Sequence, residues 1–469
     1  MAPFGPGFTI EKQRIEVTYS NDAPDHVTVR GWYRMKNTGT QPLNEMSLRL
    51  PLNWEFAPRN IHAQWMGKPL TLPAFSNDQK NLRVPLGPRL NVGDRGEFVV
   101  SYDSESPVVK PAAASQGGAA FFLPTSHWYP VWGSPHETFS SGGHPPLKWD
   151  LIVTVPNGYR VHASGRERGQ SHPEGKNGAG TAFRFEQISL NDFEPFVEAG
   201  PFLEQVVKLS QGRVIFWTYQ LVPDGRAREI GDRVASDAAF FKTEFGSSEK
   251  GGQEARIVEC LGDWAEPIQK PWGCATVPHS AVVPPDYLAN GAARNLFASV
   301  DSQLAATYFD LSVHISPDGP GYPLAEARHY ALFARGVSDD PSSRTAIIRD
   351  LLHGFYAIPV AADKPMARII SGDPEPLQQR AALQSLLFFV ALEDRCGASN
   401  LHHALARAAR ILHGQAWGVA DLRSAAEAEC GADLGEFIRQ WLARPGIPED
   451  FRTRYGEAST SAPKQPVSK

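Results

Sequence analysis

Apolar and polar residues alternate along the first hundred positions of the chain, which is typical of strands that bury one face. Ile15, Val17 and Tyr19 form one such series, and Phe98, Val100 and Tyr102 form another. Between the series lie turn-forming stretches. A second set of strands follows from residue 120 to about 200, interrupted by residues 165–181, which we interpret as a mobile hairpin loop. The pattern predicts one large antiparallel β domain over residues 8–205.

The spacing of apolar residues along the chain changes after this domain. Residues 213–220, 255–259 and 275–283 have the composition of strands, and they alternate with helical patterns. One helix is indicated by apolar residues at steps of three or four up to Gly246: Ile230, Val234, Ala238, Phe241 and Phe245. We therefore expect a mixed α/β middle domain over residues 206–375.

The rest of the chain has helical periodicity. We expect helices at residues 377–396, 401–412, 419–430 and 434–442, in a helical part that covers residues 376–455. The last residues, 456–469, are small and polar, so we expect a disordered tail.

Within the middle domain, residues 296–311 and 324–334 predict two helices that pack together. Leu296, Val300 and Leu304 recur along the first helix, and a Pro- and Gly-rich breaker at residues 317–321 separates it from the second. Glu326 lies near the start of the second helix. We expect Glu326 to face Ser302 or Ala306 on the first.

Composition and charge narrow the function classes. The formal net charge of −5 gives no electrostatic reason to expect nucleic acid or an anionic membrane as a partner. There is no run of eighteen apolar residues, so we expect no membrane span. The first residues have neither the basic start nor the apolar core of a signal peptide. The expected location is cytoplasmic if the chain is complete, and exported if a signal peptide was removed.

The chain has four cysteines and no C-x-x-C pair, which argues against a structural zinc cluster. Cys260 follows one predicted strand and Cys274 lies in the next extended stretch. The sequence leaves two readings of this pair open, a disulfide between adjacent strands or two buried thiols.

Several phrases occur in an order that matches a known family. They are Met35-Lys-Asn-Thr-Gly-Thr, Trp149-Asp-Leu-Ile-Val-Thr-Val, Phe240-Phe-Lys-Thr-Glu-Phe-Gly and Gln440-Trp-Leu-Ala-Arg-Pro-Gly-Ile-Pro. Over residues 10–455 the chain resembles the membrane alanyl aminopeptidase family of gluzincins, and its end resembles the shorter, bacterial members. The resemblance implies an N-terminal β saddle, a thermolysin-like α/β catalytic-type domain and a short helical end.

The family's zinc helix carries H-E-x-x-H, because histidines four residues apart share a helix face and the glutamate between them acts as general base. The corresponding register here is residues 302–306. Ser302 and Ala306 replace the two histidines, and Gln303 replaces the base. Glu326 matches the third ligand, one residue beyond the family's strict spacing.

Two further family motifs are altered. The exopeptidase loop, whose glutamate grips the free amine of a substrate, matches Gly273-Cys-Ala-Thr-Val, which places Thr276 at the glutamate position. The stretch that should carry the transition-state tyrosine begins at Gln378. The sequence therefore predicts a degenerate family member without catalytic residues, zinc or another cofactor. We expect a peptide or protein to bind in the cleft that corresponds to the family's active site. This cleft would be lined by Gly273, Thr276, Gln303 and Glu326.

Other readings of these residues remain open. A working zinc aminopeptidase could use displaced or unconventional ligands near Glu326, with His329 on the same helix face. A different hydrolase could reuse the cleft, although no G-x-S-x-G surrounds Ser302. We interpret the adjacent His402 and His403 as facing solvent.

Overall fold

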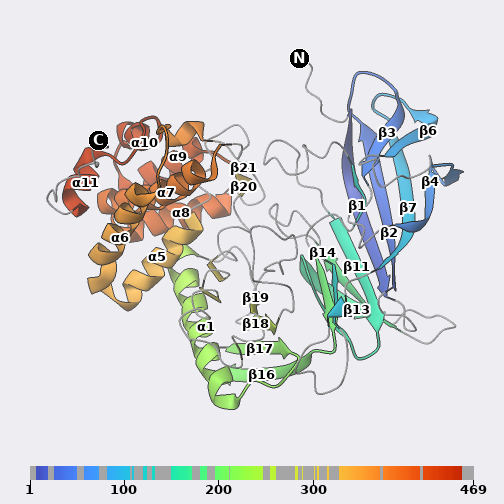
Figure 1. Ribbon diagram of the computed structural model, residues 1–469, viewed down its shortest axis with the longest axis horizontal. Coiled ribbons are helices and arrows are strands. Elements are labelled where there is room, and N and C mark those ends of the chain that lie inside the picture. The colour runs from blue at the N-terminus through green and yellow to red at the C-terminus, as the bar shows by residue number, and fades with distance from the viewer. Residues whose placement is uncertain are drawn as a thin grey trace, which may run out of the picture. The chain divides into compact units, whose positions relative to one another are not determined.

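The computed structural model describes most of the chain, and it divides into two compact units (Figure 1). Unit 1 comprises Met1–Ser236 and Gly251–Thr307, and unit 2 comprises Asp237–Lys250 and Tyr308–Lys469. The described residues are 7–19, 26–49, 58–72, 82–105, 108–109, 120–123, 129–132, 149–171, 180–186, 196–210, 212–246, 254–259, 280–283, 288, 300–301, 304–305, 314–315, 327–369, 373–411 and 416–456.

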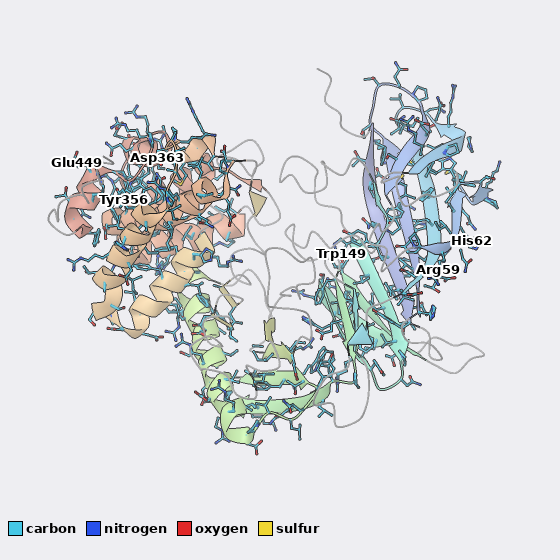
Figure 2. All side chains as sticks on the ribbon, viewed as in Figure 1. Arg59, His62, Trp149, Tyr356, Asp363 and Glu449 are labelled. Atoms are coloured by element: carbon cyan, nitrogen blue, oxygen red, sulfur yellow. A yellow bond between two sulfur atoms is a disulfide. The ribbon has the colours of Figure 1, made fainter. Side chains whose placement is uncertain are left out.

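The largest sheet of unit 1 has eight strands in the order β13-β14-β11-β1-β2-β7-β4-β5. Most neighbours are antiparallel, but β1 and β11 run parallel, with Ile15 opposite Leu151. Trp149 begins β11, and Arg59 and His62 lie on β4 (Figure 2). The strands are β1 (Phe8–Tyr19), β2 (His26–Asn37), β4 (Arg59–Trp65), β5 (Lys68–Leu70), β7 (Arg95–Glu105), β11 (Trp149–Pro156), β13 (Arg166–Ser171) and β14 (Gly180–Glu186).

The alternation in the sequence is reproduced in the burial of these strands. Val17, Val100 and Leu151 are fully buried, whereas Thr18 on β1 and Glu97 on β7 are exposed. At one position in this sheet, close packing requires a glycine. A Cβ on Gly96 would lie 2.1 Å from the ring of Trp65, so only glycine leaves room for this buried indole.

Two smaller sheets complete the β-rich part of unit 1. One has the order β10-β3-β6 and the other β12-β15-β9-β8. Their strands are β3 (Leu43–Arg49), β6 (Leu82–Leu90), β8 (Val108–Val109), β9 (Ala120–Leu123), β10 (Val131–Trp132), β12 (Arg160–Ala163) and β15 (Val197–Gly200).

A mixed sheet with the order β16-β17-β18-β19 follows. The pair β16–β17 is antiparallel, and β17, β18 and β19 are parallel. Helix α1 connects β17 to β18, as parallel neighbours require. The boundary between the two units falls within α1, after Ser236. The elements are β16 (Leu203–Leu209), β17 (Gly212–Thr218), α1 (Asp224–Phe245), β18 (Glu254–Glu259) and β19 (Ser280–Val283).

Unit 2 is mainly helical, and α7 is its most buried helix. The side chains of Leu387, Phe388 and Leu392 are fully buried, and the Cys396–Cys430 disulfide joins the ends of α7 and α9. The helices are α5 (Ala327–Asp339), α6 (Arg344–Ala357), α7 (Glu375–Cys396), α8 (Ala398–Ile411), α9 (Val419–Cys430), α10 (Gly435–Leu442) and α11 (Glu449–Tyr455), with short 3₁₀ turns η2 (Pro341–Ser343) and η3 (Met366–Arg368) and a parallel pair β20 (His314–Ile315) and β21 (Ala416–Trp417).

The predicted fold class is confirmed: an N-terminal β-rich domain, a mixed α/β middle and a helical C-terminal part. The exact domain boundaries stay predictions. The predicted tail lies outside the described residues apart from Gly456, and so do Cys260 and Cys274. Among the described residues, no helix is both long and apolar enough to cross a membrane.

Two predictions about local structure need correction. Residues 166–171 belong to strand β13 rather than to a loop, because their backbone pairs with β14. Most of this edge strand is polar and exposed, so no alternation marked it. Helix α6 was not expected, and α11 lies within the predicted helical part although no separate helix was predicted there. In α6 the signal was present, because the buried Ile348, Leu352 and Phe355 recur at helical steps.

Candidate functional site

Most of the predicted site positions cannot be placed. Gly273, Thr276, Ser302, Gln303, Ala306 and Glu326 lie outside the described residues. The expected contact of Glu326 with Ser302 or Ala306 therefore stays a prediction, and so does the lining of the cleft. Gln378 is described. It lies in the first turn of α7, and its side-chain amide donates to the backbone oxygen of Asp373 at 2.6 Å.

The described residues in and directly before the predicted zinc register have the expected helical conformation. Val300, Asp301, Leu304 and Ala305 are helical, and all except Asp301 are buried. The Asp301 carboxylate binds the guanidinium of Arg233 on α1, with 2.7 Å between Arg233 Nη2 and Asp301 Oδ2. This ion pair links α1 to the helical residue that directly precedes the register.

Unit 1 contains a buried pair of carboxylates around one tyrosine. The Glu259 side chain, at the end of β18, accepts the backbone N–H of Tyr219 at 2.7 Å. The Tyr219 hydroxyl donates to Glu198 on β15 at 3.1 Å. Burial raises the pKa of Glu259, although the Tyr219 N–H opposes this shift. Burial and the nearby Glu198 raise the pKa of the Tyr219 hydroxyl well above its usual value, so it stays a hydrogen-bond donor.

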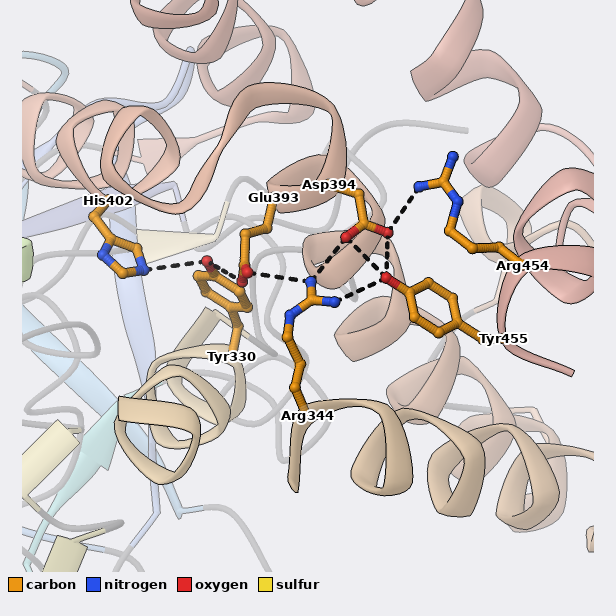
Figure 3. Close-up of polar contacts among 7 residues, drawn as sticks. All are labelled: Tyr330, Arg344, Glu393, Asp394, His402, Arg454 and Tyr455. Carbon is orange, nitrogen blue, oxygen red and sulfur yellow. Dashed lines mark hydrogen bonds and ion pairs between the residues drawn. The ribbon is translucent and has the colours of Figure 1, made fainter. Parts of the chain in front are cut away.

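The helices of unit 2 meet at a second polar cluster, which we call the helical polar cluster. Arg344 on α6 donates to Glu393 Oε1 at 3.1 Å and to Asp394 Oδ1 at 2.8 Å, both on α7. It also donates to the Tyr455 hydroxyl on α11 at 2.8 Å. Figure 3 shows the guanidinium between these three partners. Three helices are thus joined through one cation.

The electrostatics of the helical polar cluster follow from these bonds. Burial lowers the pKa of Arg344, but its bond to Tyr455 and the two adjacent carboxylates outweigh this effect and raise it. Burial raises the pKa of Tyr455, and Arg344 opposes the shift. Asp394 also accepts the hydroxyl of Tyr455 and a bond from Arg454 at 3.0 Å. The cluster therefore combines two carboxylates with two cations, Arg344 and Arg454, and the Tyr455 hydroxyl keeps its hydrogen.

One histidine was assigned wrongly from the sequence. His402 is only 5% exposed, whereas its neighbour His403 faces solvent as expected. The His402 ring lies between Glu244 on α1, at 2.8 Å from Nδ1, and the Tyr330 hydroxyl on α5, at 3.2 Å from Nε2. On α8 His402 borders the apolar stripe of Leu401, Leu405 and Ala408, and its polar partners are distant in sequence. Only the stripe was visible in the sequence.

The described residues contain no group of three or more His, Cys, Asp or Glu side chains that could hold a metal ion. His329, considered above as a partner of Glu326, lies on α5 and is partly buried.

The fold was compared with known proteins. The chain is similar to an M1 zinc metallopeptidase mutant from Deinococcus radiodurans, with a TM-score of 0.61, 16% identity, and 94% of this chain and 96% of that chain covered. A structure of that mutant with a Tyr-Ser-Ala substrate has the same TM-score and coverage and 17% identity. A two-domain M1 zinc metallopeptidase mutant bound to L-arginine has a TM-score of 0.62 and 16% identity, covering 94% and 95% of the two chains.

The chain has the fold of the M1 zinc metallopeptidases. At this level of identity the M1 likeness establishes the fold alone. No protein-family model matches the sequence, and no curated protein matches it. The M1 fold nevertheless extends over nearly the whole chain, which confirms the family-type architecture that the ordered sequence phrases predicted.

Proposed function

We propose that this chain is a degenerate aminopeptidase homologue that binds a peptide or protein and does not cleave it. One observation carries the proposal. The register that the family resemblance assigns to H-E-x-x-H reads Ser302-Gln303-Leu304-Ala305-Ala306 in this sequence. The described members of this register, Leu304 and Ala305, are helical and buried, as residues of a packed helix should be.

The residue types at these positions do not fit a catalytic zinc ion. Such an ion needs three protein ligands and one open position. Ser302 offers a hydroxyl, Ala306 a methyl group and Glu326 a single carboxylate. The Gln303 amide cannot accept a proton from water, so the general base is missing as well. We derive no reaction step from this set of side chains.

The proposed ligand follows from the fold and from one further residue. One structural neighbour was solved with a Tyr-Ser-Ala substrate. By analogy we propose that a short peptide binds in the predicted cleft, which would be lined by Gly273, Thr276, Gln303 and Glu326. Thr276 replaces the glutamate that would grip a free amine in the family. Recognition of the peptide should therefore not depend on its amino terminus.

Aminoacyl p-nitroanilides offered with excess zinc test the catalytic half of this proposal. We expect no release of nitroaniline above the buffer rate, in the wild type or in E326A. Hydrolysis that a chelator and E326A both abolish would instead favour a working zinc aminopeptidase with displaced ligands.

Calorimetry with Tyr-Ser-Ala and its N-acetylated form tests the binding half. We expect both peptides to bind, with dissociation constants within about threefold, or less than 1 kcal/mol. Strong preference for the free amine would contradict the role given to Thr276. Binding of neither peptide would contradict recognition of short peptides in the cleft.

A further inference from the structure

His402 lies in the middle of a chain of three polar contacts that links four helices of unit 2. Glu244 lies 2.8 Å from His402 Nδ1, and the Tyr330 hydroxyl lies 3.2 Å from His402 Nε2. The same hydroxyl lies 2.9 Å from Glu393 Oε2. Figure 3 shows the last two contacts as a continuous line from His402 through Tyr330 to Glu393. The groups come from α1, α8, α5 and α7.

Counting hydrogens shows that this arrangement needs an extra proton. Three hydrogen bonds require three hydrogens. A neutral imidazole supplies one and the Tyr330 hydroxyl supplies one, whereas an ionised carboxylate supplies none. With neutral His402, one of the three contacts would bring together two atoms without a hydrogen between them. With an imidazolium, both ring nitrogens donate and all three bonds are satisfied.

The surrounding groups favour the histidine as the carrier of this proton. Arg344 donates to the other oxygen of Glu393 at 3.1 Å, so both oxygens of this side chain act as hydrogen-bond acceptors. The Glu244 side chain is 36% exposed, so water can solvate its charge. Burial and Glu393 raise the pKa of Tyr330 well above its usual value, so the phenol keeps its own hydrogen. Among the described residues, the charged and titratable groups facing the ring are thus Glu244, Tyr330, Glu393 and, beyond them, Arg344.

We propose that His402 acts as a proton-dependent latch, which binds one proton on folding and thereby holds the second half of α1, α5 and α7 together around α8. When the proton leaves, the Tyr330 hydroxyl can donate to Glu393 or to His402, but not to both. The latch then loses one hydrogen bond. This device lies among residues outside the predicted peptide cleft, and it does not depend on the proposed function.

The sign of the pH effect follows from proton linkage. In this proposal the folded chain holds a proton on His402 through its two hydrogen-bond partners, and the unfolded chain lacks those partners. Because the folded state binds more protons, this contribution to stability is complete at the acidic end and disappears as the pH rises. Binding of a proton is therefore coupled to the integrity of unit 2.

Thermal unfolding of the full chain between pH 5 and 8.5 tests the latch, with H402Q and H403Q compared with the wild type. We expect the melting temperature of the wild type to fall with rising pH by about 3–6 °C more than that of H402Q, a size typical of one charged hydrogen bond in a domain this large. H403Q changes the exposed neighbour and should follow the wild-type curve. Equal pH slopes in the wild type and H402Q would overturn the proposal.

A spectroscopic readout does not require H402Q to fold. In wild-type protein labelled with ¹⁵N in its histidine rings, the resonance of His402 can be assigned by its shift in Y330F. We expect both ring nitrogens to carry hydrogens at pH 6.5. A neutral ring at that pH would overturn the proposal.

Discussion

The strands of the eight-stranded sheet in unit 1 are joined by one kind of contact, and the helices of unit 2 are joined by another. Along the sheet, apolar side chains such as Val17 and Leu151 are buried, and ion pairs such as Arg83–Glu45 elsewhere in unit 1 lie at the surface, with side chains 80% and 59% exposed. In unit 2, Arg344 pairs with Glu393 and Asp394, whose side chains are only 13% and 12% exposed.

This difference has a structural reason. Neighbouring strands share backbone hydrogen bonds, so the ladder itself fixes which strands are adjacent and in what register. A helix satisfies its backbone hydrogen bonds internally, so its neighbours are fixed by side chains alone. In unit 2, buried polar bonds and a disulfide add specific connections between helices that apolar packing leaves less defined.

The largest expected change in the free energy of unfolding comes from removing the Arg344 guanidinium from the helical polar cluster. R344M keeps much of the apolar stem but leaves Glu393 without its cation and Asp394 with Arg454 alone. We expect a loss of about 3–5 kcal/mol in the free energy of unfolding, because an uncompensated buried charge is costly. Chemical denaturation followed by circular dichroism measures this loss.

The matched control is R83M, which breaks the exposed pair with Glu45 in unit 1. Such surface pairs contribute about 0–1 kcal/mol, so we expect little change. A similar loss in both variants would remove the contrast between the two units.

The second effect concerns the Cys396–Cys430 disulfide, which closes a segment with a sequence separation of 34. The double variant C396S/C430S should lose about 3–4 kcal/mol, since a cross-link of this span restricts the unfolded chain. Unfolding of the wild type in reductant should show the same loss. Equal stability of the oxidised wild type and the double variant would show that the helices do not rely on this bond.

The difference between the sheet and the helices also explains which parts of the structure could be predicted from the sequence. Alternating apolar and polar residues predicted β1 and β7, because a strand with one buried face shows this pattern within its own sequence. The partners of His402 lie 158 and 72 positions away, on Glu244 and Tyr330, and no local pattern connects them. For the candidate site, the sequence supplied the residue types at 302, 303 and 306, but the positions of these side chains depend on packing that a sequence does not display.

A smaller change in stability is expected in unit 1, where Glu259 is one of the two buried carboxylates around Tyr219. Its pKa is raised mainly by burial, so folding resists its ionisation, and this penalty grows as the pH rises above the usual range of a glutamate. E259Q retains an oxygen that can accept the Tyr219 N–H. We expect E259Q to match the wild type near pH 4 and to be more stable at pH 8. Thermal unfolding at both values measures this, and a less stable E259Q at pH 8 would contradict it.

The smallest expected effect is that of a chelator. A metal that binds the native state stabilises it by mass action, and its removal lowers the melting temperature. If neither unit relies on zinc, melting curves with and without EDTA should coincide. A fall of several degrees in EDTA would add metal ligation to the contacts that hold this chain together.

Zinc content tests the central proposal most directly. Protein purified in the presence of zinc and dialysed against metal-free buffer can be analysed by plasma mass spectrometry, with E326A measured in parallel. Because Ser302, Ala306 and Glu326 supply one carboxylate where three ligands are needed, we predict far less than one equivalent of zinc in both proteins. One equivalent in the wild type that is lost in E326A would contradict the proposal and identify a working metal site.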